Sequence, residues 1–311
     1  MQVKPQGSAL ITALFIMTLV AIAATAMSTR LQLDIYRTHL AITSDKLYLA
    51  SQGVTFWAMN TLSTKNRHHL ISREEGKVAD YPTALQNAYP DVVSTGRLYD
   101  LHAFFNLNNL QDIKFHSLFF RLVEGRLKTS TGEQRKKLIN SIHYWTSTYQ
   151  PSRGHDEELD FYLKQKPAYL PSYQPMQSIS ELRLIHGVSA ESYQSLVPLL
   201  TVLPEKTRIN LNTAPRSLLM TLGNGLNDSD VDELLQKRGA KGFKNFNKIG
   251  QLLQNLDIPG DQITIESQYF LSVSTVSSED LNLVTYTVLK RIKDRSEQPL
   301  ISIISERLNT I

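Results

Sequence analysis

The N-terminal segment combines two successive apolar patterns. No charged residue lies between Lys4 and Arg30, and this run is long enough for a bilayer, which takes roughly 20 mostly apolar residues of helix. From Leu31 to Met59 apolar residues recur near a helical period, and no proline interrupts Gln6–Tyr81. The pattern predicts one long helix from Ser8 to about Leu62, whose second half is amphipathic and packs on a sheet.

Beyond this helix the pattern changes twice. Residues 63–100 contain prolines and glycine and predict loops, with a short strand at Leu98–Leu101. The tail alternates, so Ile263–Ser274 and Leu281–Lys293 predict an antiparallel hairpin, followed by a strand at Leu300–Ile304. On either side of a loop at 149–175, helical periodicity recurs in Asn109–Leu127, Thr131–Ser147, Ser178–His186, Ala190–Leu200, Pro215–Leu222, Asp228–Lys237 and Asn247–Asn255.

These elements predict an α+β fold: a long N-terminal helix packed on a small antiparallel sheet, with a large all-α domain inserted. A chain of 311 residues suits about two domains, at roughly 100–200 residues each. The expected divisions are a leader at 1–7, a transmembrane part at 8–29, a discontinuous α/β domain at 30–104 and 261–311, and the inserted helical domain at 105–260.

The apolar segment by itself allows three interpretations. A cleaved secretory signal would use the small residues around Ala23–Ala26 as its cutting site, after an apolar core of about 7–15 residues. A signal anchor fits the hydropathy equally well. A type IV prepilin leader would be cut between Gly7 and Ser8, before the apolar run, which then stays in the mature protein.

Charge and composition narrow the function classes. Lys4 precedes the apolar run while Arg30 and Arg37 follow it, a weak signal; we expect the leader in the cytoplasm and the bulk outside it. The chain contains no cysteine, which excludes thiolate catalysis and cysteine-based zinc sites. A net charge of +4 is compatible with an anionic partner but selects none. No metalloprotease, hydrolase or phosphate-loop motif occurs, so we expect no enzyme.

Three motifs in this order resemble a known family. They are the Gly7–Ser8 junction, the segment Ser180–Val188 with Leu199–Pro204 after it, and the Asn-Leu-Asn-Thr-Ala-Pro sequence within Ile209–Pro215. Together they resemble protein K of the bacterial type II secretion system, the largest minor pseudopilin, over essentially the whole chain. The resemblance implies that the discontinuous α/β domain is pilin-like.

The resemblance also implies a function in assembly. Prepilin peptidase would cut between Gly7 and Ser8, and the new N-terminus would be methylated. The protein would cross the bacterial inner membrane once, with its C-terminal bulk in the periplasm. With proteins I and J, and protein H, it would form the tip complex that initiates and caps the pseudopilus for export of folded proteins across the outer membrane. The major pseudopilin and the inner-membrane secretion platform are further implied partners.

Thr12 occupies the fifth position after the expected cut. In major pilins a glutamate at this position is thought to pair with the terminal amine of a neighbouring subunit, because an unpaired charge in lipid is costly. Protein K typically lacks this glutamate. A subunit with no other subunit above it needs no such glutamate, so threonine at this position suits a filament tip.

The Asn-Leu-Asn-Thr-Ala-Pro motif has a second interpretation. Similar text opens helix-hairpin-helix modules in membrane-anchored DNA receptors of competence and type IV pilus systems, and residues 178–258 would form SAM-like or helix-hairpin-helix-like segments. We expect Asn210 or Asn212 to cap a helix that starts near Pro215. A phosphate-binding turn at Leu222–Leu226 would lie beside several lysines, but the acidic residues of Asp228–Glu233 would repel phosphate. We therefore favour a structural use and expect no nucleic acid.

The acidic loop at residues 155–160 is the candidate metal site. Calcium takes several oxygen ligands, and Glu157, Glu158 and Asp160 would supply them together with loop carbonyls. Family members bind Ca2+ near such a loop, after an Asp-Trp-x-Asp segment. Here Tyr144–Ser147 stands at that place and both aspartates are replaced, so the sequence predicts a site that has lost ligands.

Replacing Gly7 with phenylalanine should leave an uncut, membrane-bound precursor, because the expected peptidase cut follows a glycine. N-terminal sequencing and mass measurement on protein purified from membranes check this. The unmodified chain should begin at a methylated Ser8, and Val3→Phe, a bulky change away from the cut, should be processed normally. Normal processing of Gly7→Phe contradicts the prepilin interpretation.

Overall fold

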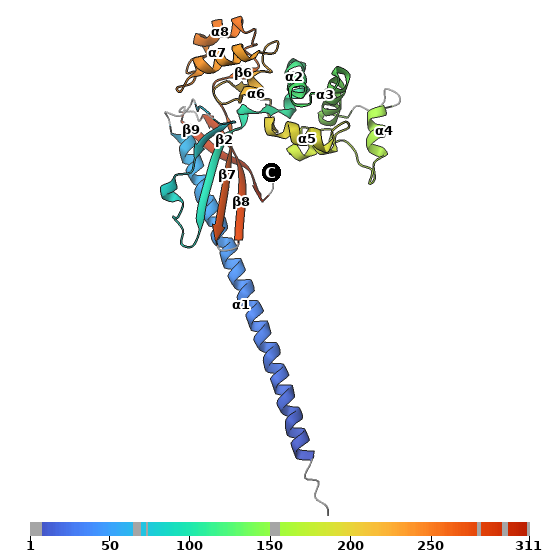
Figure 1. Ribbon diagram of the computed structural model, residues 1–311, viewed down its shortest axis with the longest axis vertical. Helices are drawn as coiled ribbons and strands as arrows, with labels where there is room; N and C mark the ends of the chain where they lie inside the picture. The colour runs from blue at the N-terminus through green and yellow to red at the C-terminus, as the bar shows by residue number, and fades with distance from the viewer. Residues whose placement is uncertain are drawn as a thin grey trace, which may run out of the picture.

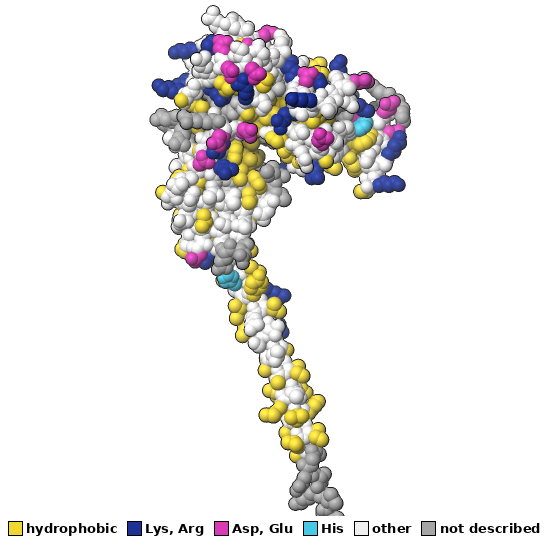
Figure 2. All heavy atoms as spheres, in the orientation of Figure 1, with side chains coloured by type: hydrophobic (Ala, Val, Ile, Leu, Met, Phe, Trp, Pro, Cys, Tyr) yellow, Lys and Arg dark blue, Asp and Glu magenta, His cyan; other side chains and the backbone are white. Residues whose placement is uncertain are grey.

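The structure, a computed structural model, describes residues 8–64, 70–72, 74–149, 156–278, 281–293 and 298–309. Its first element, α1 (Ser8–Ser63), is one helix of 56 residues, which confirms the predicted long helix. The N-terminal half extends away from the rest of the molecule, and its surface is largely apolar (Figures 1 and 2). Among the described residues this is the one helix apolar enough to cross a membrane, with a mean hydropathy of 2.4 in its most apolar window.

The C-terminal half of α1 packs on a five-stranded antiparallel sheet of order β1-β2-β7-β8-β9. Its hairpin is confirmed, with Ser278 paired to Leu281, although Ile263–Thr264 lies outside it. That segment (β6) instead pairs in parallel with β5 (Ile209–Asn210). The strands of the sheet are β1 (Lys77–Asp80), β2 (Val93–Asp100), β7 (Tyr269–Ser278), β8 (Leu281–Lys293) and β9 (Pro299–Leu308).

Two parts of the predicted sheet were wrong. Within the loop-rich stretch 63–100, where one short strand at Leu98–Leu101 was predicted, the structure has β1 and all of β2 in addition to the short helix η1 (Thr83–Leu85). The last strand extends to Leu308 rather than ending at Ile304. Both differences follow from pairing: β2 is hydrogen-bonded to β7, and β9 to β8, along their lengths.

The contact between α1 and the sheet is close because small side chains line it. Ala50, Val54 and Ala58 are each at most 1% exposed against the strands. Opposite Val54 lies Gly96 on β2, where an added Cβ would stand 2.3 Å from Val54 Cγ1. The helix therefore seats directly on the backbone of the sheet at this point.

The helical region lies between β2 and β7 and has its own continuous core. The predicted helix 109–127 is instead two short 3-10 turns followed by α2, and the predicted loop 149–175 contains α4. The region comprises η2 (Leu101–Ala103), β3 (Phe105–Asn106), η3 (Leu107–Gln111), η4 (Ile113–Phe115), α2 (His116–Arg126), α3 (Gly132–Thr146), α4 (Glu157–Leu163), η5 (Ile179–Leu184), α5 (Ala190–Leu196), η6 (Val197–Leu199), β4 (Leu200–Thr201), β5, α6 (Arg216–Leu219), α7 (Asp228–Arg238), η7 (Phe246–Ile249), α8 (Gly250–Asn255) and β6.

The inserted helical region sits at one end of the sheet, and the free half of α1 extends from the other end (Figure 1). The two-residue strands β3 and β4 pair in parallel within the region, as do β5 and β6. They join the first segment of the region to β4 and its last segment to β5. The region leaves and re-enters the sheet at neighbouring points, because Asp100 of β2 stands opposite Phe270 of β7.

Gly96→Ala should lower the free energy of unfolding by about 1–3 kcal/mol, because the new methyl group overlaps Val54. Thermal unfolding of the full chain in detergent measures this. Gly125→Ala is the matched control: Gly125 lies in α2 with nothing within 4 Å of an added Cβ, so alanine should leave stability unchanged or raise it slightly. Equal effects of the two substitutions would contradict the packing described.

Candidate functional site

The site that joins the sheet to the helical region is built around Asp100, the last residue of β2. Its side chain is fully buried. Oδ1 accepts the backbone N–H of His102 at 2.8 Å, and Oδ2 accepts Asn210 Nδ2 at 2.9 Å, Thr213 Oγ1 at 2.5 Å and Ser267 Oγ at 2.6 Å. These donors come from three separate stretches of chain, so one carboxylate fixes the two crossings into the region and the β5 segment relative to one another.

Asn210 and Asn212 hold the segment that surrounds Asp100. Besides its bond to Asp100, Asn210 donates to Ser267 Oγ at 2.8 Å, and its Oδ1 accepts the Asn212 N–H. Asn212 is likewise fully buried, with Nδ2 donating to the carbonyls of Phe243 and Ile265 and Oδ1 accepting the Phe243 N–H. The motif therefore ties the α7–α8 connection and β6 to the junction.

The expected helix-capping role of this motif is wrong. The N-cap position of α6 is occupied by Pro215, which has no side-chain cap hydrogen bond. The amides of Asn210 and Asn212 are directed to partners far along the sequence instead. A sequence pattern typical of a local helix cap thus forms hydrogen bonds between segments that are distant in the sequence.

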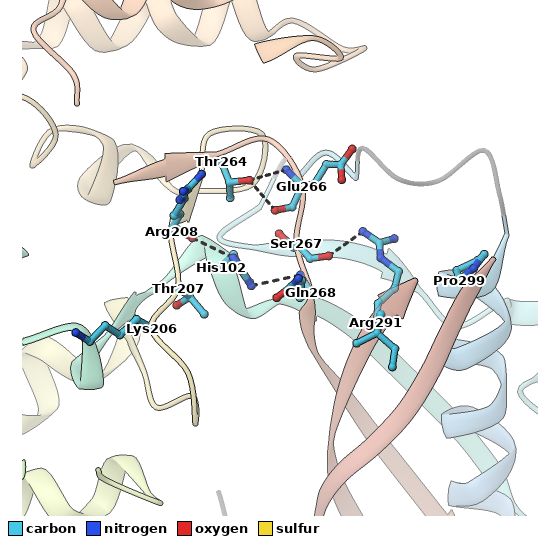
Figure 3. A pocket seen from close by; sticks show the side chains of 11 residues that line it. His102, Lys206, Thr207, Arg208, Thr264, Glu266, Ser267, Gln268, Arg291 and Pro299 are labelled. Atoms are coloured by element: carbon cyan, nitrogen blue, oxygen red, sulfur yellow. Dashed lines mark hydrogen bonds between the residues drawn. The ribbon is translucent and has the colours of Figure 1, made fainter. Parts of the chain in front are cut away.

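His102 completes the junction as a neutral imidazole. Nδ1 donates to the carbonyl of Arg208 at 3.0 Å, and Nε2 accepts the backbone N–H of Gln268 at 3.3 Å, which defines the tautomer (Figure 3). Burial lowers the pKa of His102, and the nearby positive charge of Arg291 acts in the same direction, against the opposing effect of Asp100. The ring joins the β5 segment to the segment before β7.

A polar cavity of about 530 Å3 lies beside His102 (Figure 3). Arg291 enters it from β8, where its guanidinium donates to the Ser267 carbonyl at 2.9 Å and lies 4.9 Å from the ring centre of Phe270. Burial lowers the pKa of Arg291, while the charges of Asp100 and Glu266 oppose this. The described groups form a hydrogen-bonded support and contain no nucleophile paired with a base.

The turn considered for phosphate binding is occupied by protein contacts. Gly223 and Gly225 have φ angles of 57° and 97°, as expected for such a turn. However, Arg121 of α2 donates to the carbonyls of Thr221 and Gly223. A Cβ on Gly223 would also stand 2.7 Å from the carbonyl oxygen of Leu256. The turn is thus packed against α2 and the end of α8, which favours a structural role.

The charges around that turn point the same way. Arg216 forms ion pairs with Asp228 and Asp232 of α7, and Lys237 pairs with Glu233. Arg238 donates to the carbonyls of Leu211 and Ala214 within the motif segment. These three cations therefore form contacts within the described chain.

The three predicted metal ligands do not converge. Glu157 is exposed in the first turn of α4, and Asp160 lies 3.7 Å from Lys164 Nζ. Glu158 Oε2 pairs with His186 Nδ1 at 2.9 Å. Its Oε1 is buried without a hydrogen-bond partner in the described chain, but a single oxygen falls far short of the roughly six to eight that calcium takes.

The neighbouring carboxylate of Asp156 also has other hydrogen-bond partners. Asp156 caps α4 through the Leu159 N–H and accepts the Tyr144 hydroxyl at 2.5 Å. Across the described residues no group of three or more His, Cys, Asp or Glu side chains is arranged to hold a metal ion. The described carboxylates therefore do not fit a calcium site.

The predicted processing residues are Gly7 and Ser8. Gly7 lies outside the described residues, and Ser8 is the first residue of α1. Thr12 lies in the free half of the helix. The sequence interpretation missed Asp100, His102 and Arg291, since isolated polar residues next to strand ends carry no periodic or motif signal.

A long N-terminal helix, apolar in its free half and packed in its second half on an antiparallel sheet with an inserted helical region, defines a pilin-like subunit. Two models of the type II secretion system protein K family match residues 103–205 and 209–272. The chain belongs to this family, whose members are structural proteins rather than enzymes.

Relatives and a solved structure agree with this membership. The type II secretion system protein K of Klebsiella pneumoniae is 28% identical over 78% of each chain, and that of Aeromonas hydrophila 28% identical over 76% of this chain and 77% of its own. For the Pseudomonas aeruginosa protein, also 28% identical, the match spans 48% of this chain and 45% of the relative. The crystal structure of the GspK-GspI-GspJ complex from enterotoxigenic Escherichia coli shares the fold, with a TM-score of 0.64 at 22% identity over 91% of this chain and 99% of its own.

The lowered pKa of His102 predicts acid sensitivity. Below its ordinary value near 6.5, the unfolded histidine takes up a proton that the folded one refuses, so the free energy of unfolding falls as pH drops. The expected slope from this group is at most about 1.4 kcal/mol per pH unit. Thermal unfolding of the full chain between pH 7 and 5 should show a smaller loss for His102→Gln. His39→Gln, at an exposed position on α1, should leave the slope unchanged; an equal slope in all three chains would contradict the assignment.

Proposed function

We propose that this protein is the minor pseudopilin that initiates and caps the type II secretion pseudopilus at its tip. The observation that carries the proposal is the position of the inserted helical region, at the end of the sheet remote from the free half of α1 (Figure 1). In a filament whose subunits all point their anchor helices the same way, that region occupies the space of a subunit added above. The chain then accepts neighbours beside and below it, and ends the filament.

The solved complex of similar fold contains GspI and GspJ beside GspK, which supports proteins I and J as the partners of this chain in a tip complex. Protein H and the major pseudopilin would follow below them. The free half of α1 would wait in the bacterial inner membrane, with the sheet and helical region in the periplasm. Its length and exposure support this, since all of its most apolar window lies outside the protein core.

Processing would prepare the anchor for assembly. Prepilin peptidase would remove residues 1–7, and methylation would follow at Ser8; the secretion platform would then extract the helix into the filament. No acidic residue precedes Asp34 in the chain, so Thr12 marks a helix that brings no carboxylate into lipid. A subunit with no neighbour above it needs no carboxylate at this position to pair with that neighbour's terminal amine, which supports the tip position.

Antibody labelling of filaments tests the capping role. Sheared pseudopili should bind gold-labelled antibody against the inserted region at one end only, because one subunit caps each filament. Antibody against the major pseudopilin should label the full length and serves as the control. Labelling by the first antibody along the filament would contradict a cap, and failure of the full chain to copurify with proteins I and J would contradict the tip complex.

A further inference from the structure

The two edges of the sheet are protected to very different degrees. The β1 edge has four residues and an irregular register, and Lys77 on it bonds to Glu74 and Asp80. Short, charged and irregular strands are how proteins keep an edge from pairing with other chains. The β9 edge has ten residues, and Pro299–Ser305 contains no charge. Within the part of the chain that the structure describes, the β1 edge is short and charged, whereas β9 is a long uncharged edge strand with no strand on its outer side.

The side chains of β9 are also unusually apolar for a surface strand. Leu300 is 53% exposed, Ile303 46%, Ile304 45% and Leu308 46%. By the register with β8, Ile303 stands opposite Leu289, which faces α1, while Leu300 stands opposite Ile292 on the other face. Exposed apolar residues therefore occur on both faces of the strand. This is the composition of an inner strand, which ordinarily has a neighbour on each side.

An apolar groove of about 580 Å3 adjoins β9 on the face of the sheet that turns away from α1. Tyr286 and Val288 of β8 form one wall together with Ile304, and Ile179 and Val202 of the inserted region line the other. A side chain projecting from a strand beside β9 would meet this groove. The groove therefore extends the docking surface from the backbone edge to the underside of the inserted region.

Arg307 is the one charged residue among those lining the groove. Its guanidinium donates to Ser178 Oγ at 3.3 Å and to the Gln177 carbonyl at 3.0 Å, which holds it in place. Within the described chain no carboxylate forms an ion pair with it. An acidic group on an incoming segment would complement this positioned cation at low ordering cost.

We propose that β9 receives an extended segment of a neighbouring tip subunit as a sixth strand. An extended backbone is the occupant because another strand matches the N–H and C=O groups that residues 300–305 direct away from β8, whereas a helix has already paired its own. The segment is uncharged where it lies along Pro299–Ser305, places an apolar side chain in the groove, and carries an acidic group beside Arg307. The identity of the partner as a tip subunit rests on the proposed function; the strand pairing rests on the edge itself.

Hydrogen–deuterium exchange on the full chain, alone and copurified with proteins I and J in detergent, tests the pairing. The β9 amides of residues 300–305 that point away from β8 should exchange about tenfold more slowly in the complex, since added strand bonds protect them. The β1 amides should not change. A complex that forms with unchanged β9 exchange overturns the sixth strand while leaving the proposed function standing, whereas failure to form any complex contradicts the proposed function.

Variants locate the contact more narrowly. Leu300→Lys and Ile304→Lys should each weaken the complex about tenfold, because a charge is placed on the pairing edge. Leu85→Lys is the matched control, at an apolar side chain 42% exposed in η1, outside the groove. Equal weakening by the control would overturn the assignment to β9.

Two further experiments test the acidic group of the docking segment and distinguish a different subunit from a second copy of this chain. Arg307→Gln keeps hydrogen-bond donors for Ser178 and Gln177 but removes the charge, so it should weaken the complex and reduce the dependence of binding on salt. Protection of β9 in the isolated chain that increases with its concentration would show pairing between two copies, and would overturn the proposal of a different subunit as the partner.

Discussion

The buried carboxylate of Asp100 is the interaction on which the arrangement of the molecule depends. An ionised group out of water is tolerated only when hydrogen bonds replace its hydration, and the donors here come from the backbone of His102 and from the side chains of Asn210, Thr213 and Ser267. A shift of the inserted region away from the sheet would leave that charge buried and short of donors. The orientation of the region is thus enforced by the cost of an unsatisfied charge, in addition to apolar contact.

This enforcement matters because the helical region and the sheet have separate main cores and share the small cluster of Leu101, Leu203 and Tyr269. Two such bodies joined by chain crossings alone would turn about each other, and the blocking position at the end of the sheet would be lost. His102 and Arg291 add hydrogen bonds between the same few segments. These bonds cost the burial of a charged or titratable group and the loss of side-chain freedom. This cost is acceptable in a protein whose role is to keep its shape rather than to catalyse a reaction.

The sequence predicted the features that depend on local pattern and missed those that depend on distant partners. The long helix and the β7–β8 hairpin follow from apolar periodicity, and both are confirmed. Strand β1 was missed, and only the end of β2 was predicted, as a short strand at Leu98–Leu101, because the residues of β2 become a full strand only when β7 lies beside them. Asn210 and Asn212 were singled out correctly but given a local cap, since a single sequence does not show that Asp100 and Phe243 lie against them. Similarly, the acidic run at the start of α4 looked like a ligand set, while its carboxylates cap the helix or pair with His186 and Lys164.

The edge strand β9 is also consistent with this architecture. In the proposed filament, a subunit whose inserted region blocks one end and whose α1 anchors the other has only its flanks left for neighbours. On the β1 flank Lys77 and its two carboxylate partners keep the edge hydrated and closed. On the β9 flank, residues 300–305 form the outer strand of the described sheet and expose apolar side chains, at a risk of aggregation that a short charged strand would avoid. A protein without partners would have no reason to carry that risk. If β9 receives a neighbour as proposed, the difference between the two flanks makes the subunit asymmetric, with a neighbour pairing along β9 and none along β1.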